Sequence, residues 1–178
     1  MFYNFLKPKE VFEEAINTDD YSGAVLIAFV AAAILFVAAF LYSNDLYASF
    51  FTGLTLLIQW YVLTAILYSF EFMVKNKRRK ITEKTFREIA TGTGRLWTIP
   101  LILMVLVLAT VILNNEVISL LVVLAFSVLS LLYLYNLYVL IKVTLQSTTK
   151  RTVVAWILAI ILHSLIVLTI LIVLGIIF

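Results

Sequence analysis

The stretch YSGAVLIAFVAAAILFVAAFLY, residues 21–42, carries no charged side chain and decides the class of fold. It is followed by the three residues SND and by a second apolar run at residues 46–74, so two long apolar segments meet at a tight turn. A helix needs roughly 20 apolar residues to cross a hydrocarbon core of about 30 Å. The two runs therefore predict a transmembrane helical hairpin.

Three further apolar runs follow, at residues 96–113, 117–141 and 152–178. The whole chain is 64% hydrophobic and 13% charged, whereas soluble domains are roughly half hydrophobic and a quarter charged. All five runs are too long for barrel strands, and helices satisfy their own backbone hydrogen bonds in lipid. We therefore predict an all-α integral membrane protein with a single domain over residues 1–178 and five transmembrane helices.

The cations of the chain predict its orientation. All thirteen Lys and Arg residues fall in the segments on one side of the five apolar runs. The two loops on the other side, Ser43-Asn44-Asp45 and Asn114-Asn115-Glu116, carry acids and no cation. Because cytoplasmic loops retain Lys and Arg, we expect the N-terminus inside and the C-terminus outside. A basic inner face is suited to anionic inner-leaflet lipids.

Short amphipathic helices are expected at the inner surface before the first and third spans, near residues 8–16 and 82–90. Pro8 is suited to a first helical turn, and Phe12 lies on an apolar stripe that could sit in the headgroup layer. A small-residue link with Gly92 and Gly94 then leads to Pro100, within the first turn or two of the third span, where a proline costs few hydrogen bonds. The two units of surface helix and hairpin are interpreted either as parallel copies or as a chance similarity.

The densest group of charges is Lys75, Lys77, Arg78, Arg79 and Lys80, between the second and third spans. Near an anionic surface, each cation contributes about 1 kcal/mol to membrane attraction. The run either fixes topology alone or also binds anionic lipid or a protein partner. Nucleic acid is not expected as a partner, because no soluble domain accompanies the run and no aromatic side chains interleave with it.

Polar side chains inside a bilayer are costly, so each is a functional candidate. Four are singled out here: Gln59, Glu71, Asn136 and His163. Gln59 is expected to make an interhelical hydrogen bond, and Glu71 either pairs with Lys75 four residues later or serves a site. His163 is expected near the bilayer centre, either hydrogen-bonded to another helix or in a proton or ligand site.

Asn136 lies at a depth shared by four tyrosines, so this level is either a polar cavity that opens inward or an aromatic belt; the tyrosines are Tyr68, Tyr133, Tyr135 and Tyr138. With no cysteine and a single histidine, the chain offers no metal or cofactor set. It also lacks a nucleophile–base pair and a phosphate-cradling glycine loop, so no catalytic residues are predicted.

The order of motifs resembles the Yip family, five-span membrane proteins known for interacting with Ypt and Rab GTPases. Leu6-Lys7-Pro8-Lys9-Glu10-Val11-Phe12 resembles the Pro-x-x-x-Phe element that precedes the first span of the family. The segment from Phe86 to Pro100 is similar to its short helix, small-residue link and proline before the third span. The stretch from Tyr135 to Ala155 is similar to the loop between its last two spans, with Lys142, Ser147, Lys150 and Arg151.

Eukaryotic members of the family imply Rab binding and vesicle traffic, and they carry an Asp-Leu-Tyr-Gly-Pro motif in a long polar N-terminal region. In this chain only about twenty residues precede the first span, and Asp45-Leu46-Tyr47 continues as Ala48-Ser49 on the outer side. The chain therefore resembles the short prokaryotic branch, which favours a prokaryotic cytoplasmic membrane over the alternative, the Golgi or endoplasmic reticulum membrane of eukaryotic members.

The expected function is that of a non-enzymatic protein that organises membrane or binds lipid or a protein partner through its basic cytoplasmic face. Two alternatives stay open. One is a small-solute or ion transporter that uses the polar intramembrane residues, and the other is a stabilising subunit of a larger membrane complex. Homo-oligomerisation is compatible with each of these functions.

Overall fold

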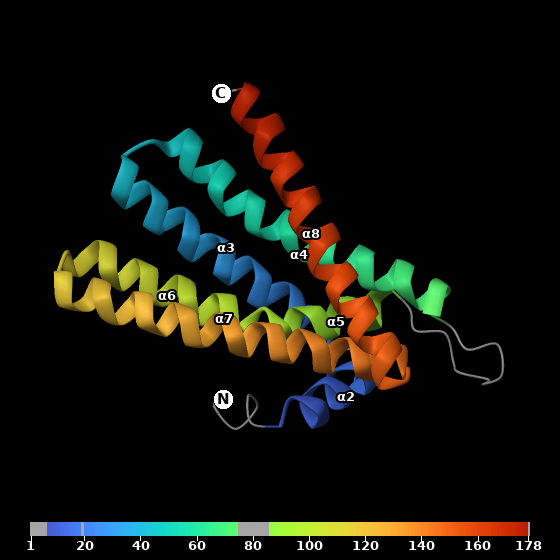
Figure 1. The fold of residues 1–178 in the computed structure, drawn as a ribbon. Coiled ribbons are helices and arrows are strands. Elements are labelled where there is room, and N and C mark those ends of the chain that lie inside the picture. Colours follow the sequence, from blue (N-terminus) through green and yellow to red (C-terminus); the bar gives the residue numbers. More distant parts are fainter. Residues whose placement is uncertain (1–6, 19, 75–85, 178) are drawn as a thin grey trace.

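Helices make up nearly all of the part of the chain that the computed structural model describes, residues 7–18, 20–74 and 86–177. In chain order they are α2 (Pro8–Thr18), α3 (Tyr21–Ser43), α4 (Leu46–Val74), α5 (Phe86–Leu96), α6 (Thr98–Leu113), α7 (Glu116–Leu145) and α8 (Thr149–Ile177) (Figure 1). Five segments are long and apolar enough to span a membrane: α3, α4, the combined segment Phe86–Leu113, α7 and α8. The prediction of five spans in an all-α membrane protein is confirmed, with span ends that differ by a few residues.

The two hairpins, α3–α4 and α6–α7, turn in the same way. Asn44 ends α3 and Asn114 ends α6, both in the left-handed conformation, with φ of 55° and 41°. Asparagine adopts this conformation more readily than other residues with a side chain, which is why it closes helices here. The following residues, Asp45 and Asn115, each accept hydrogen bonds from two backbone N–H groups in the first turn of the next helix. Each tight turn is therefore a left-handed cap followed directly by an N-cap.

The core lies at one end of the bundle, around α5. This helix contacts α2, α3, α4 and α7. From that end the α3–α4 hairpin, the α6–α7 hairpin and α8 extend outward and fan apart (Figure 1). The largest fully buried apolar side chains are Trp60, Leu63, Leu67, Ile89, Leu96, Trp97, Leu140 and Ile141. Toward the tips of the hairpins the large apolar side chains are mostly exposed, as expected for surfaces that meet hydrocarbon rather than water.

The predicted link at residues 91–94 is wrong, because these residues belong to α5 and are buried. A Cβ atom on Gly94 would overlap the Cβ of Ala24 in α3 and would lie 2.7 Å from the Ala24 Cα atom. A Cβ atom on Gly92 would lie 2.7 Å from Leu140 Cδ1 of α7. Glycine is therefore used for close helix packing, and this packing outweighs its low helix propensity. The bend before the third span is at Trp97, between α5 and α6.

The surface helix before the first span exists as α2, but its apolar stripe does not face the headgroup layer. Phe12 and Ile16 are each only 2% exposed, and Ala15 is buried beside them. They are buried because α2 lies against α5 and α7. Pro8 begins α2 and Pro100 lies in the first turn of α6, both as predicted. The structure thus contradicts shallow lipid insertion by the apolar stripe of α2.

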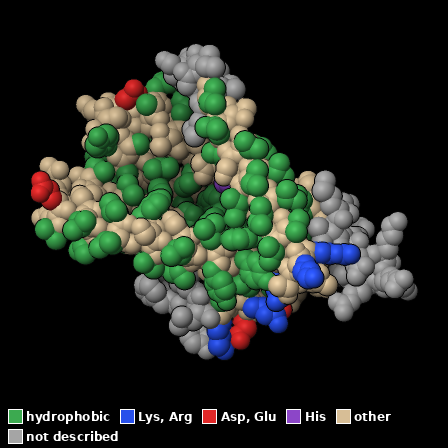
Figure 2. Space-filling model, viewed as in Figure 1, with side chains coloured by type: hydrophobic (Ala, Val, Ile, Leu, Met, Phe, Trp, Pro, Cys, Tyr) green, Lys and Arg blue, Asp and Glu red, His purple; other side chains and the backbone are tan. Residues whose placement is uncertain are grey.

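Charge is distributed unevenly over the molecule. In Figure 2 the Lys and Arg side chains in view gather around the end where α2 and α5 lie, and isolated acidic side chains mark the far tips. The surface between these ends is largely apolar. This arrangement agrees with the predicted grouping of cations on one side of a membrane. The assignment of that side as the inner side stays a prediction.

Candidate functional site

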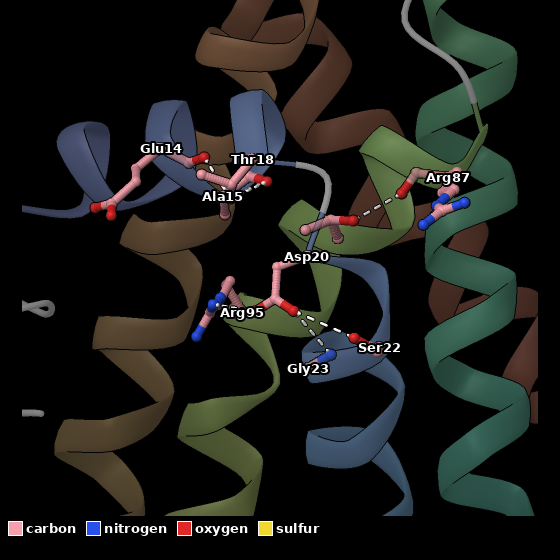
Figure 3. Close-up of polar contacts among 9 residues, drawn as sticks. Glu14, Ala15, Thr18, Asp20, Ser22, Gly23, Arg87 and Arg95 are labelled. Atoms are coloured by element: carbon pink, nitrogen blue, oxygen red, sulfur yellow. Dashed lines mark hydrogen bonds and ion pairs between the residues drawn. The ribbon is translucent and has the colours of Figure 1, made fainter.

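The junction between α2 and α3 is fixed to α5 by a carboxylate. Asp20 Oδ1 accepts a hydrogen bond from the backbone N–H of Gly23 at 3.1 Å, which caps α3. Its other carboxylate oxygen lies 2.5 Å from Arg95 Nη2 in α5 (Figure 3). Both side chains are about one-third exposed, so the ion pair itself adds little, while the cap contributes about 1 kcal/mol. Asp20 thus orients α3 and α5 relative to one another.

Two further contacts hold α5 in place. The Arg87 guanidinium lies over the Tyr21 ring, 5.6 Å from its centroid. On the buried side, Trp60 Nε1 of α4 donates to Thr93 Oγ1 at 3.0 Å, and Thr64 Oγ1 lies 2.7 Å from the same oxygen. Because every polar atom in this buried group finds a partner, the group joins α4 to α5 without a desolvation penalty. Sequence reasoning missed it, although an indole N–H in an apolar helix normally finds a partner when buried.

A cleft of about 630 Å³ opens between α2 and the last turns of α7. Its polar lining comes from both helices and from the residues that follow α7: Lys9, Glu13, Asn17, Tyr135, Tyr138, Lys142, Gln146 and Ser147. Three of these, Tyr135, Tyr138 and Lys142, recur every three or four residues and share one face of α7. Of the two alternatives for this level, a polar cleft is observed here, with two of the four tyrosines in its wall and without Asn136, and its opening toward the inner side stays a prediction. The depth of Tyr135 and Tyr138 was the sequence signal for it.

The two lysines of the cleft differ in their surroundings. Lys9 Nζ lies 3.7 Å from Glu13 Oε1, in an exposed pair on one face of α2. Lys142 makes no ion pair within residues 7–18, 20–74 and 86–177. The buried carboxylate of the bundle, Glu71, lies on α4 rather than in this cleft. Lys142 is therefore the lysine of the cleft whose charge no acid offsets in the described parts of the chain.

The four polar intramembrane candidates are not gathered in one place. His163 Nε2 lies 3.3 Å from the backbone carbonyl oxygen of Gln59 in α4, which agrees with the interpretation that His163 makes a hydrogen bond to another helix. That contact uses the Gln59 backbone, not the side-chain bond that was expected. Asn136 is buried and donates from Nδ2 to Leu132 O of its own helix at 2.8 Å. Glu71 is 7% exposed, and its expected partner Lys75 lies outside the described residues.

Gln59 and His163 instead line a second cavity, of about 370 Å³, inside the membrane-spanning part of the bundle. Neither Glu71 nor Asn136 contributes to it. Tyr133 lines this cavity, whereas Tyr68 packs edge-on against Phe86 of α5. The basic run Lys75, Lys77, Arg78, Arg79 and Lys80 lies outside the described residues, directly after the end of α4. Among the residues that are described, no cluster of three His, Asp or Glu side chains could hold a metal ion.

Five apolar helical spans, two capped hairpins and a basic end define a polytopic α-helical membrane protein. Its helices follow one another in the order expected from the sequence resemblance to the Yip family. The chain belongs to the Yip1 family, because the family model of the Yip1 domain matches residues 3–172. No curated protein and no solved structure matches the chain. The family predicted from the residues is therefore confirmed.

Proposed function

We propose that this Yip1-family protein is a non-enzymatic membrane protein that recognises anionic phospholipid at its basic end, in the cleft between α2 and α7. The supporting observation is Lys142, whose charge has no ion-pair partner in the described parts of the chain and which lines the cleft with two tyrosines. A lipid phosphate would accept hydrogen bonds from the Lys142 ammonium group and from the hydroxyls of Tyr135 and Tyr138.

The exposed face of α7 supports the same placement of a lipid. Leu124, Val128 and Leu131 are exposed and lie three or four residues apart, on the face that continues to Tyr135 and Lys142. An acyl chain can follow this apolar stripe while its headgroup reaches the lysine. The distance from Leu131 to Lys142 along the helix is about 16 Å, so chain and headgroup contacts fit one lipid molecule.

The membrane we propose is a prokaryotic cytoplasmic membrane, with the basic end on its inner side. Cytoplasmic retention of cations and the resemblance to the short branch of the family support this placement. The run from Lys75 to Lys80 directly follows α4 in sequence and adds to the attraction for anionic lipid. Asp45-Leu46-Tyr47 gives no support for Rab binding, since Asp45 caps α4 at the hairpin tip far from the cations.

The test is the affinity for phosphatidylglycerol in nanodiscs, measured by native mass spectrometry, for Lys142→Gln and Lys150→Gln. One cation near an anionic surface contributes about 1 kcal/mol, so Lys142→Gln should weaken binding about fivefold. Lys150 is the matched control: it is an exposed lysine in the first turn of α8 and does not line the cleft. Lys142 is exposed as well, so the two lysines differ in their position relative to the cleft and not in their exposure. Lys150→Gln should change the affinity less than twofold, because salt screens a charge that does not contact the headgroup directly.

Equal losses in the two variants would mean that the lipid senses the overall charge of this end and not the cleft. An unchanged affinity in Lys142→Gln would reject the site. The variant Tyr138→Phe refines the result, because it removes a hydroxyl from the cleft and leaves the charge unaltered.

A further inference from the structure

The second cavity, of about 370 Å³, is walled by four elements that meet in the membrane-spanning part of the bundle. Its lining comes from the four helices α4, α6, α7 and α8 and from Trp97 at the bend before α6, and Figure 2 shows a hollow with the purple imidazole of His163 beside it. Apolar side chains form most of the wall, among them Leu56, Ile99, Leu103, Met104, Phe126 and Leu129. No charged residue belongs to the described lining.

Two hydrogen-bond donors in this wall have no partner among the described residues. Trp97 is 2% exposed, and its indole N–H makes no hydrogen bond within the described residues. The neighbouring Tyr133 ring stands edge-on to it, with centroids 6.3 Å apart, and the Tyr133 hydroxyl makes no hydrogen bond to any described residue. In hydrocarbon no water replaces a missing partner, so such donors are costly to leave unsatisfied.

From this juxtaposition we propose that the cavity binds a neutral lipid with an apolar chain and one hydrogen-bond-accepting oxygen. The oxygen would accept from the Tyr133 hydroxyl, and the chain would occupy the apolar wall toward Phe126. A charged headgroup is excluded because the described lining holds no countercharge, and an unpaired charge at this depth is costly.

The volume of the cavity suits a lipid chain but is too small for a helix from another protein. A helix about 10 Å across needs about 850 Å³ for two turns, more than twice the volume present. Cavities that hold small molecules are roughly 300–1,000 Å³, and this one lies in that range. The imidazole of His163 is fixed at the wall by its contact with the Gln59 carbonyl, so this side of the cavity is preformed.

The proposal is tested by quenching of tryptophan emission in phosphatidylcholine nanodiscs, because Trp97 lies in the cavity wall. Three probes share one chain and differ in the head: dibrominated octadecanol, its methyl-ester counterpart and dibrominated octadecane. The alcohol and the ester, which both carry an acceptor oxygen, should quench saturably and bind more tightly than the alkane. Tyr133→Phe should weaken binding of the alcohol about two- to tenfold and leave the alkane unchanged.

Two controls separate the cavity from the rest of the protein. Tyr135→Phe removes the same hydroxyl from a residue two positions away that lines the cleft instead, and it should leave quenching unchanged. Ser130→Phe fills the cavity and should abolish saturable quenching by all three probes. Affinity for phosphatidylglycerol should be unaltered in Tyr133→Phe, so failure here and failure of the proposed function are distinguishable.

The inference is overturned if the alkane binds as tightly as the alcohol, because the Tyr133 hydroxyl then has no role. It is also overturned if dibrominated octadecanoate binds more tightly than the alcohol, since the site would then favour charge. Quenching that never saturates, the result expected if a second copy of the chain covers this face, rejects it as well.

Discussion

The contact between Gly94 of α5 and Ala24 of α3 provides a direct test of the packing. In Gly94→Ala the new methyl group would overlap the Ala24 Cβ atom and would lie 2.7 Å from its Cα and 3.1 Å from its carbonyl carbon. Two of these three atoms are backbone, so only a separation of the two helices relieves the overlap. Overpacking of this kind costs about 1–3 kcal/mol, and alanine returns about 1 kcal/mol of helix propensity. Because two of the three overlapping atoms belong to the backbone, we expect the overpacking cost to lie at the upper end of this range, which leaves a net loss of about 2 kcal/mol.

Gly92→Ala is the matched control, because it adds the same methyl group two residues earlier in the same helix. Its nearest neighbour is Leu140 Cδ1 at 2.7 Å, the end of a flexible side chain, and Ile16 follows at 3.6 Å. Rotation of Leu140 relieves that contact, and the gain in helix propensity offsets the remainder. We therefore expect Gly92→Ala to change stability by less than about 1 kcal/mol.

The assay is the midpoint of thermal unfolding in mild detergent, read by size-exclusion chromatography after heating. For a chain of this size, about 2 kcal/mol corresponds to a fall in Tm of roughly 4–8 °C. Ala24→Gly in the Gly94→Ala background should restore part of the loss, because it removes the nearest atom but leaves the Ala24 Cα in place. Equal midpoints for the Gly94 and Gly92 variants would refute the close crossing of α3 and α5.

Two further predictions concern the polar contacts that hold α5. Asp20→Ala removes both the cap of α3 and the ion pair with Arg95, and it should cost about 1–2 kcal/mol of stability. Asp20→Asn keeps the cap and should cost less, so its Tm should lie above that of Asp20→Ala. Thr93→Val leaves the buried Trp60 indole N–H without its acceptor and should cost about 1–3 kcal/mol. Thr110→Val loses only a bond to Leu106 O of its own helix, α6, and should be nearly neutral, so Thr93→Val melting like Thr110→Val would contradict this.

The spans, the turns and the position of Pro100 could be predicted because each depends on local chemistry. A run of apolar residues long enough to cross the bilayer is visible in sequence alone, and an Asn followed by an acid or amide marks the ends of two helices. Asn136 and the tyrosines near it were placed at one depth by counting residues along the helix from Lys142. These predictions required no knowledge of which helix faces which.

The role of α5 could not be predicted in the same way. Thr91, Gly92, Thr93 and Gly94 have low helix propensity, so they were interpreted as a link, and only the partner surface makes them helical. A signal was present in α3, where Ala24, Ala28, Ala31 and Ala32 are spaced as small residues are at close helix crossings. In lipid, however, exposed and buried faces are both apolar, so hydrophobic periodicity does not tell them apart.

The packing of α5 also determines the geometry of the proposed lipid site. One wall of the cleft is α2, which is held by its burial against α5 and α7 rather than by lipid. In turn, α5 is fixed by the close approach of Gly94 to Ala24 of α3. It is also held by the ion pair of Arg95 with Asp20 and by the hydrogen bond that Thr93 accepts from the Trp60 indole. Lys9 and Lys142 are therefore presented by helices already in place, so under the proposed function a lipid phosphate would bind without first ordering them. Preorganisation of this kind raises affinity by lowering the entropic cost of binding. A weakened α5 contact should consequently reduce lipid affinity even though no residue of the cleft has changed.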